Sequence, residues 1–325
     1  MIISKTPYRI SFFGGGTDFP NWYKDNRSLV ISTTINHYSY ITLKDLPKIF
    51  KYKFRIRYFY REEASNINAI KHPVIKSILK YKKFKGNLDI VHHGDLPARS
   101  GIGSSSSFSV GMINVLNALN NIKITKKRLA KQSIHLEQNI LKEKVGSQDQ
   151  IAAVYGGLNS IYFHKKKFSC IPVKMKKKNL VEFQKWIQLF FIDQRSSQYV
   201  EKDKINQMKK NSIYYLKINE IAKKALKILK LQKKNFLLKL GKLLNDQWEL
   251  KKKLSKKVSN KRIDYIYKKA LSNGAVGGKI IGAGGGGFIM FLTPPSKQKK
   301  LQKALNLSEV KIKFDSKGST IIYKD

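Results

Sequence analysis

The feature that most constrains the fold is LPARSGIGSSSSFSVGMINVLNAL, from Leu96 to Leu119, in which a Gly-x-Gly turn and four serines precede an apolar segment. The apolar residues of that segment recur at helical spacing and predict a buried helix that begins near Phe108. A glycine-rich turn entering a helix exposes unpaired N–H groups at the positive end of the helix dipole, where anions bind. Because one serine suffices for a cap, four favour a phosphate site, with simple capping as the alternative. The Gly-x-x-x-x-Gly-Lys-Ser/Thr spacing of a P-loop is absent.

Length and composition predict a globular chain of two domains. The 325 residues exceed the size at which a single core usually divides. No uninterrupted apolar run approaches the ~20 residues of a membrane span, and the N-terminal residues lack the pattern of a secretory signal. A lone cysteine, Cys170, excludes an internal disulfide and a zinc site built from cysteines. We therefore expect a cytoplasmic protein without a membrane partner.

The charge of the chain is extreme. Its 65 Lys+Arg against 21 Asp+Glu give a net charge of +44, which would attract nucleic acid or another polyanion. The lysines, however, are spread through the chain as pairs and triplets beside many Ile and Asn residues. That distribution favours compositional bias, and the sequence disfavours a nucleic-acid partner.

Strand-like and helix-like segments alternate along the N-terminal half of the chain. A helix capped by Thr125 is expected to run to about Lys144. The C-terminal half begins near Trp186, and two long lysine-rich helices are expected between about residues 198 and 258. The final segment reads as a hairpin that turns at residues 315–318.

Two carboxylates stand at unusual positions. Glu137 interrupts the apolar stripe of the helix after Thr125, so it either binds a metal or reaches solvent or a lysine. Ser147 and Gln150 fit a capping box that places Asp149 in the first turn of the next helix. There Asp149 either complements the helix dipole or serves as an ionised acid that orients or deprotonates a hydroxyl.

A second glycine run lies near the C-terminus. The segment IIGAGGGGFIMFL places Gly284–Gly287 between two strand-like stretches. A hairpin needs only one or two glycines. Four indicate either a backbone packed closely against another backbone or a ligand, or simple flexibility.

Taken in order, three segments resemble motifs one, two and three of the GHMP kinases: Thr6–Pro20, Leu96–Ser107 and Lys279–Phe291. With GSQDQIAAVYGG and FDSKGSTIIY, they are most similar to the branch that acts on heptose phosphates. The triplet Gly14–Gly16 departs from the Gly-Glu-His-Thr-Asp of galactokinases, which disfavours galactose. The resemblance implies a two-domain α+β architecture, with an N-terminal domain like ribosomal protein S5 domain 2 (residues 1–183) and a ferredoxin-like C-terminal domain (residues 184–325).

The same resemblance implies ATP and Mg²⁺ as cofactors and assigns candidate residues to each. Asp149 matches the catalytic base, and Arg9 matches the cation that stabilises it. Ser105 and Glu137 match the magnesium ligands. The candidates for ATP binding are Pro97, Arg99, Ser100, Gly101, Ile102, Gly103, Ser104, Ser105, Ser106, Gly284 and Gly285.

For the sugar, the resemblance implies Asp18 as the ligand of the hydroxyls. The other candidates are Gly15, Gly16, Thr17, Gly157 and Arg195. Of these, Arg195 is a candidate for a substrate phosphate, with a solvent-facing arginine as the alternative. The implied activity is ATP-dependent phosphorylation of the anomeric hydroxyl of a heptose 7-phosphate. The alternatives are another sugar such as L-fucose and, more remotely, RNA binding on an S5-like fold. The implied partners are small molecules, and a homodimer is left open.

Overall fold

The computed structural model describes residues 1–165, 167–194 and 197–325, so the candidate Arg195 lies outside the described residues. One sheet follows the order β13-β1-β2-β5-β3-β4; β6 and β12 also pair with β2, and β7 pairs with β6. The longest strands are β1 (Ile2–Phe13) and β2 (Ser28–Asp45), whose register runs almost end to end. The other strands are β3 (Phe54–Arg57), β4 (Arg61–Ala64), β5 (Leu88–Gly94), β6 (Asn159–His164), β7 (Lys167–Pro172), β12 (Phe314–Asp315) and β13 (Thr320–Lys324).

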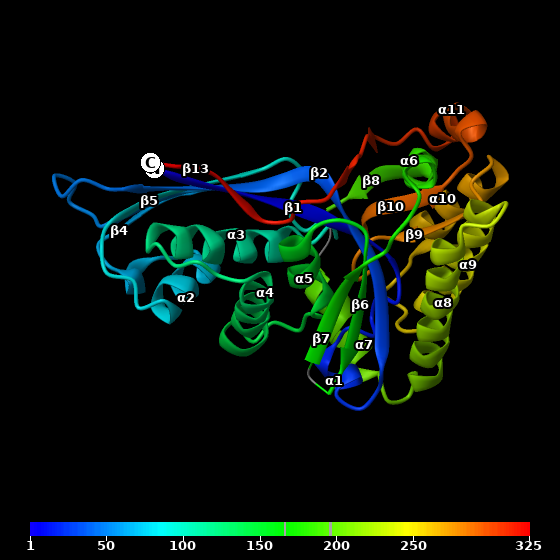
Figure 1. Ribbon diagram of the computed structural model, residues 1–325, viewed down its shortest axis with the longest axis horizontal. Coiled ribbons are helices and arrows are strands. Elements are labelled where there is room, and N and C mark those ends of the chain that lie inside the picture. Colours follow the sequence, from blue (N-terminus) through cyan, green and yellow to red (C-terminus); the bar gives the residue numbers. More distant parts are fainter. Residues whose placement is uncertain (166, 195–196) are drawn as a thin grey trace.

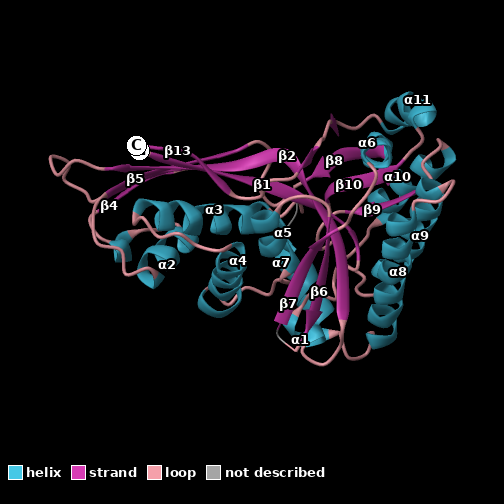
Figure 2. Ribbon diagram, in the orientation of Figure 1, coloured by secondary structure: helices cyan, strands magenta, loops and turns pink. Residues whose placement is uncertain are grey.

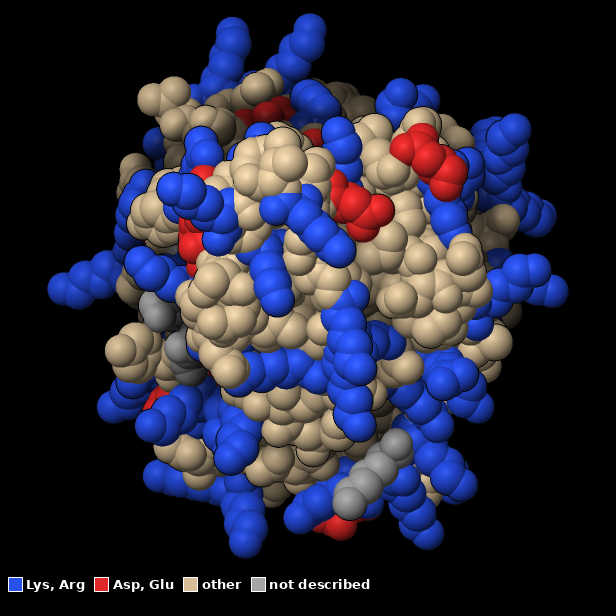
Figure 3. All heavy atoms as spheres, turned by 90° about the vertical axis from the view of Figure 1, so that its left-hand side faces the viewer, with Lys and Arg blue, Asp and Glu red and all other residues tan. Residues whose placement is uncertain are grey.

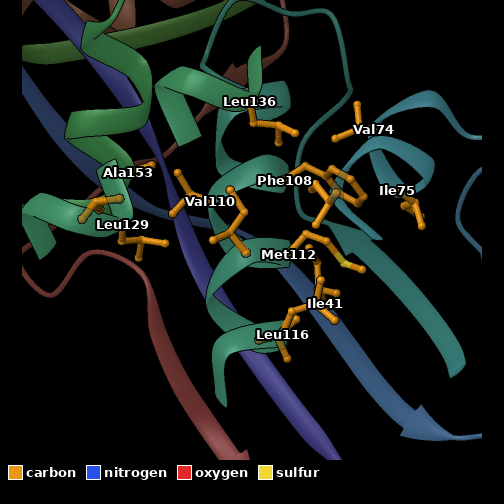
Figure 4. Packing of buried hydrophobic residues seen from close by; sticks show 14 of the residues in the cluster. Ile41, Val74, Ile75, Phe108, Val110, Met112, Leu116, Leu129, Leu136 and Ala153 are labelled. Atoms are coloured by element: carbon orange, nitrogen blue, oxygen red, sulfur yellow. The ribbon is translucent and has the colours of Figure 1, made fainter. Parts of the chain in front are cut away.

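Helices lie against one face of this sheet (Figures 1 and 2). They are α2 (Pro73–Tyr81), α3 (Ser104–Leu119), α4 (Lys126–His135) and α5 (Gln148–Tyr155), and the short α1 (Pro20–Tyr23) follows β1. At the centre, α3 buries Phe108, Met112 and Leu116 among residues of its neighbours (Figure 4), which include Ile41, Val74, Ile75, Leu129, Leu136 and Ala153. Because each fully buried aliphatic or aromatic side chain contributes ~1.5–3 kcal/mol, this packing holds the N-terminus of α3 in a fixed place.

The second sheet is antiparallel with the order β11-β8-β10-β9. Its strands are β8 (Ile187–Asp193), β9 (Gly277–Ile280), β10 (Gly287–Leu292) and β11 (Glu309–Val310). Helix α6 (Lys177–Trp186) precedes this sheet in the chain. The helices that follow β8 are α7 (Ser197–Asn206), α8 (Ser212–Leu231), α9 (Phe236–Lys252), α10 (Lys261–Ser272) and α11 (Pro295–Leu305). The strand–helix order is that of the ferredoxin-like motif with extra helices after β8. This confirms the predicted α+β class.

Three local predictions are wrong. The region between residues 198 and 258 holds three helices, α7, α8 and α9, where two were expected. The helix capped by Thr125 leaves α geometry at Leu136 and passes into one π turn, Leu136–Ile140. The C-terminal segment is not a hairpin, because β12 pairs with β2 and β13 pairs with β1.

The two sheets share a hydrophobic core, which positions the site between them. Ile10 and Phe12 of β1 pack in one cluster with Leu240 of α9 and Met290 of β10. Side-chain hydrogen bonds cross the same junction, since Gln247 of α9 donates to Phe12 O and accepts from the amide of Gly14. The predicted domain boundary after residue 183 falls within α6 and stays a prediction. Among the described residues, no helix is both long and apolar enough to cross a membrane.

Candidate active site

The N-terminus of α3 forms one wall of the site. The helix begins at Ser104, a turn earlier than the periodicity predicts, so the serines are its first turn. Its N-cap is Gly103, in the left-handed region at φ 76°, and no side chain caps the helix. Gly103 is glycine because a side chain in that conformation is strained. The amides of the first turn therefore have no intrahelical acceptor, and the residues that carry them, Ser104–Ser106, line the pocket.

The loop before α3 is braced from two sides. From β1, the amide of Arg9 donates to Ile102 O at 3.0 Å. From the second glycine run, the amide of Phe288 donates to Ser100 O at 3.0 Å. A Cβ on Gly287 would lie 2.2 Å from the same oxygen. The second glycine run thus packs backbone against backbone beneath the loop, as one of the two sequence readings predicts.

Arg9 and Asp149 form a two-pronged ion pair at the base of the pocket. Arg9 Nε donates to Asp149 Oδ1 at 2.7 Å, and Arg9 Nη2 lies 2.5 Å from Oδ2. Arg9 Nη1 also donates to Gly101 O. The Arg9 side chain is buried while Asp149 keeps about a quarter of its surface exposed. The guanidinium therefore fixes the orientation of a carboxylate that still reaches the pocket.

Asp18 approaches the same space from the turn after β1. Its carboxylate accepts from the amides of Gly16 at 2.9 Å and Gln148 at 3.3 Å. Burial raises the pKa of Asp18, and the negative charge of Asp149 raises it further, while the two amides lower it. Asp18 therefore ties the Gly14–Gly16 turn to the first residue of α5 and places a second acidic group next to Asp149.

Glu137 is buried in the π turn after α4. Its Oε2 accepts from Ser106 Oγ at 2.9 Å and from Gln150 Nε2. Its Oε1 is buried with no hydrogen-bond partner among the described residues. Burial raises the pKa of Glu137 to about 8, with the charge of Glu143 as the next cause. A buried carboxylate with an unpartnered oxygen fits a hard cation that prefers oxygen ligands.

These contacts change two details of the sequence analysis. Ser147 is the N-cap of α5 but makes no capping hydrogen bond with its side chain, and Gln150 bonds to Glu137, so the predicted capping box is wrong. Asp149 does lie in the first turn of α5. Among the serines, Ser106 contacts Glu137, whereas the predicted magnesium ligand Ser105 is exposed at the rim.

One pocket, with about 150 Å³ of interior space, brings most of the candidates together. Those that line it are Arg9, Gly15, Gly16, Asp18, Arg99, Gly101, Gly103, Ser104, Ser105, Ser106, Glu137 and Asp149. Candidates outside the lining are Pro97, Ser100, Ile102, Thr17, Gly157, Gly284 and Gly285.

The excluded candidates have structural contacts of their own. The Thr17 hydroxyl donates to Gly14 O at 2.8 Å. The Gly157 amide donates to Asp315 O at 2.8 Å and lies 2.8 Å from Thr34 Oγ1. From the second glycine run, Gly282 and Ala283 line the pocket in place of Gly284 and Gly285. Sugar binding by Gly157 and ATP binding by Gly284 and Gly285 therefore stay predictions.

Several lining residues were missed by sequence reasoning. The most prominent are three lysines from different elements, namely Lys204, Lys251 and Lys279. The sequence could have pointed to Lys279, because this lysine interrupts a short apolar strand directly before the glycine run. Lys204 and Lys251 carry none, since they stand among many similar lysines on lysine-rich helices.

The outer surface bears most of the positive charge. On the face shown in Figure 3, Lys and Arg side chains spread between other residues, with few acidic groups among them. They are spread over the whole of that face and are not confined to one side of it. This distribution agrees with compositional bias, and it separates the surface charge from the few cations that line the pocket.

Comparison with known proteins defines the class. Residues 68–157 match the GHMP kinases N terminal domain, and residues 223–310 match the GHMP kinases C terminal domain. With the near full-length relatives described next, these matches show that the chain belongs to the GHMP kinases. It is an ATP-dependent sugar kinase, a phosphotransferase with an alcohol group as acceptor.

Individual relatives refine this assignment. The D-glycero-alpha-D-manno-heptose 7-phosphate kinase of Campylobacter jejuni is 30% identical over 315 residues, which cover 94% of this chain and 93% of the relative. The galactokinase of Pyrococcus furiosus is 26% identical, with 99% and 97% covered. The crystal structure of a D-glycero-D-manno-heptose 1-phosphate kinase from Bacteroides thetaiotaomicron has a TM-score of 0.79 at 23% identity, with both chains fully covered, and so shares the fold.

Proposed function

We propose that the protein transfers the γ-phosphoryl group of ATP to the anomeric hydroxyl of D-glycero-D-manno-heptose 7-phosphate, giving heptose 1,7-bisphosphate and ADP. The name of the Campylobacter jejuni relative supports a heptose 7-phosphate as the acceptor. The Gly14–Gly16 triplet supports the same choice against galactose. A relative that contains a fucokinase is 23% identical, so L-fucose is the alternative acceptor.

One observation carries the proposal. A Cβ built on Gly103 would lie 3.4 Å from Asp149 Oδ2 and 3.2 Å from Arg9 Cγ. The free amides of α3 and the Asp149 carboxylate therefore border the same small space. An anion held by the amides and a hydroxyl held by the carboxylate would be direct neighbours there, which is the arrangement that in-line phosphoryl transfer needs.

The residues divide the chemistry in the following way. Asp149 accepts the proton of the anomeric hydroxyl as that oxygen attacks the γ-phosphorus, and the bond from the γ-phosphorus to the bridging oxygen of ADP breaks. Arg9 holds Asp149 in place and lies beside the charge that develops on the transferring group. The first-turn amides of α3 offset the charge of the nucleotide phosphates without reorganising, because the helix fixes them in advance.

Magnesium has a suitable place in this arrangement. Glu137 would hold it with its unpartnered Oε1, and the hydroxyls of Ser105 and Ser106 are oxygen donors at the same helix end. A magnesium ion bound there would neutralise charge on the phosphate oxygens. Without a bound cation, the charged form of the buried Glu137 has no cationic partner among its described contacts.

The substitution Asp149→Asn tests the chemical role of the carboxylate. We expect kcat with heptose 7-phosphate to fall by about 10²–10⁴-fold, the usual loss for a missing general base. The affinity for a non-hydrolysable ATP analogue, measured by thermal shift, should change little. The matched control is Asp25→Asn, an exposed aspartate outside the pocket lining. If the Asp149 variant stays within threefold of wild type, the carboxylate only complements the helix dipole.

A sugar panel tests the acceptor. ADP release should give the highest kcat/KM with heptose 7-phosphate, above unphosphorylated heptose, L-fucose and galactose. A higher kcat/KM with L-fucose would replace the proposed substrate while leaving the kinase class intact.

A further inference from the structure

A second glutamate accompanies Glu137 in the lining of the pocket. Glu143 belongs to the segment between the π turn and α5, and its amide donates to Glu137 O at 2.8 Å. This contact keeps the segment next to the π turn, and both glutamates line the pocket. Glu137 is only 1% exposed, and Glu143 is partly buried. The pocket therefore has a second carboxylate on the same short stretch of chain, which sequence reasoning missed.

The two carboxylates are close enough to affect each other. After burial, the negative charge of Glu143 is the largest cause that raises the pKa of Glu137, ahead of the opposing side-chain hydrogen bonds. Burial also raises the pKa of Glu143. Among the described residues, neither carboxylate pairs with a lysine or arginine, although the chain carries 65 of these. The two negative charges therefore repel each other, and the protein supplies no cation that offsets them.

The oxygens of both carboxylates also lack donors. Glu137 Oε1 is buried with no partner, and the Glu143 carboxylate accepts no hydrogen bond, in the part of the chain that the structure describes. Glu137 Oε2 accepts from Ser106 Oγ at 2.9 Å, so Glu137 reaches the start of α3. A phosphate on the first-turn amides of that helix would be repelled by this negative charge. A divalent cation that prefers oxygen ligands would bind the free oxygens and remove the repulsion.

We propose that Glu143 is the second carboxylate of the magnesium site and that, together with Glu137, it binds the divalent cation before the nucleotide arrives. This inference rests on the proposed function, which places magnesium at Glu137, and it adds a ligand and an order of binding. Mg²⁺ commonly uses one or two carboxylates and takes its other ligands from water and substrate phosphates. With one carboxylate, binding of the ion depends on the nucleotide, whereas two adjacent carboxylates attract the ion by themselves. The nucleotide phosphates then approach a site whose negative charge is already neutralised.

Binding of Mn²⁺ to the full chain without nucleotide, measured by electron paramagnetic resonance, tests the inference. Mn²⁺ is the probe because it prefers the same oxygen ligands as Mg²⁺. Wild type should bind the ion, and Glu143→Gln should weaken binding by about 10–100-fold, the usual loss when a metal site loses a partner. Glu137→Gln should weaken binding at least as much. Glu143→Asp, which keeps the charge, should retain more affinity than Glu143→Gln, and the control Glu220→Gln, at an exposed position of α8, should match wild type.

Thermal melts distinguish a metal ligand from a structural residue. In EDTA, Glu143→Gln should be at least as stable as wild type, because the substitution removes one of two like charges. Mg²⁺ added without nucleotide should raise the Tm of wild type and leave the Tm of the variant nearly unchanged. A variant that is less stable than wild type in EDTA and gains equally from Mg²⁺ would make Glu143 a structural residue and refute the inference.

The remaining outcomes separate this inference from the proposed function. If Glu143→Gln binds Mn²⁺ like wild type while Glu137→Gln does not, Glu143 is not a ligand, and magnesium keeps its proposed place at Glu137. If wild type binds Mn²⁺ only when an ATP analogue is present, the ion arrives with the nucleotide, and the inference is wrong in the same way. If neither variant changes Mn²⁺ binding even with the analogue, the placement of magnesium at Glu137 is wrong as well. No sugar takes part in these measurements, so the sugar panel tests the proposed substrate independently.

Discussion

Replacing Gly287 with alanine tests whether the second glycine run supports the phosphate-binding loop. The new Cβ would lie 2.2 Å from Ser100 O and 2.7 Å from Ser100 C, both backbone atoms, at a φ of +85°. A left-handed conformation costs alanine ~1–2 kcal/mol, and overpacking that moves backbone costs about 1–3 kcal/mol more. We expect a loss of ~2–5 kcal/mol, which lowers Tm by roughly 4–15 °C in a chain of this size.

The loop before α3 should move with Ser100, so KM for ATP should rise more than KM for the sugar. Gly86→Ala is the matched control, because Gly86 also has a positive φ of +145° but its Cβ would meet only the Phe84 side chain, at 3.1 Å, and it lies outside the pocket lining. The control variant also strains the backbone but introduces a much smaller steric clash. Thermal melts and steady-state kinetics on both variants measure the difference. Equal Tm and equal KM for ATP would refute the reasoning.

Two further predictions address the other walls of the pocket. The substitution Glu137→Gln tests the metal site through its pH dependence. Burial raises the pKa of Glu137 to about 8 in the folded state without metal, whereas the carboxyl group of the unfolded chain releases its proton above about pH 4.5. The free energy of unfolding of wild type should therefore fall as the pH rises from about 4.5 toward 8. In EDTA, the free energy of unfolding of the variant relative to wild type should increase by on the order of a few kcal/mol between about pH 5 and pH 8. Mg²⁺ should stabilise only wild type. Thermal melts that show the same pH dependence for both proteins would contradict this. Gly146→Ala would place a Cβ 1.9 Å from Asp18 Oδ2 and displace that carboxylate, so KM for the sugar should rise about tenfold or more with KM for ATP within twofold; an equal rise in both would make Asp18 a structural residue.

The parts of the fold that local chemistry determines were predictable from the sequence. The glycine turn, the buried helix after it and the cap at Thr125 all depend on neighbouring residues, and the structure has them in place. The start of α3 was misplaced because the apolar period begins only at Phe108, while the four small serines before it carry no periodic signal.

Long-range pairing was not predictable in the same way. A turn-rich end with alternating residues fits a hairpin, but Gly318 packs at Val154 O and the Ser319 amide donates to Ala153 O. These contacts with α5 separate β12 from β13. Likewise, nothing local marks the π turn that carries Glu137 into the core.

The site shows the same division. Glu137 and Asp149 could be singled out from their positions, one in the apolar stripe of a predicted helix and one in a first helical turn. Asp18 was assigned by the resemblance of Thr6–Pro20 to the first GHMP kinase motif. Lys204 and Lys251 could not be singled out, because a strongly basic composition hides the few buried lysines among many exposed ones. Only the folded structure distinguishes them, because it buries both side chains in the lining of the pocket.

The central claim is that ATP places its phosphates on the free amides of α3, across from Asp149. A crystal structure with a non-hydrolysable ATP analogue and Mg²⁺ tests it most directly. Phosphate oxygens within hydrogen-bonding distance of the Ser104–Ser106 amides, with the γ-phosphate between those amides and Asp149, are the predicted result. A nucleotide bound against the second sheet, with the start of α3 left in contact only with protein, would contradict the account.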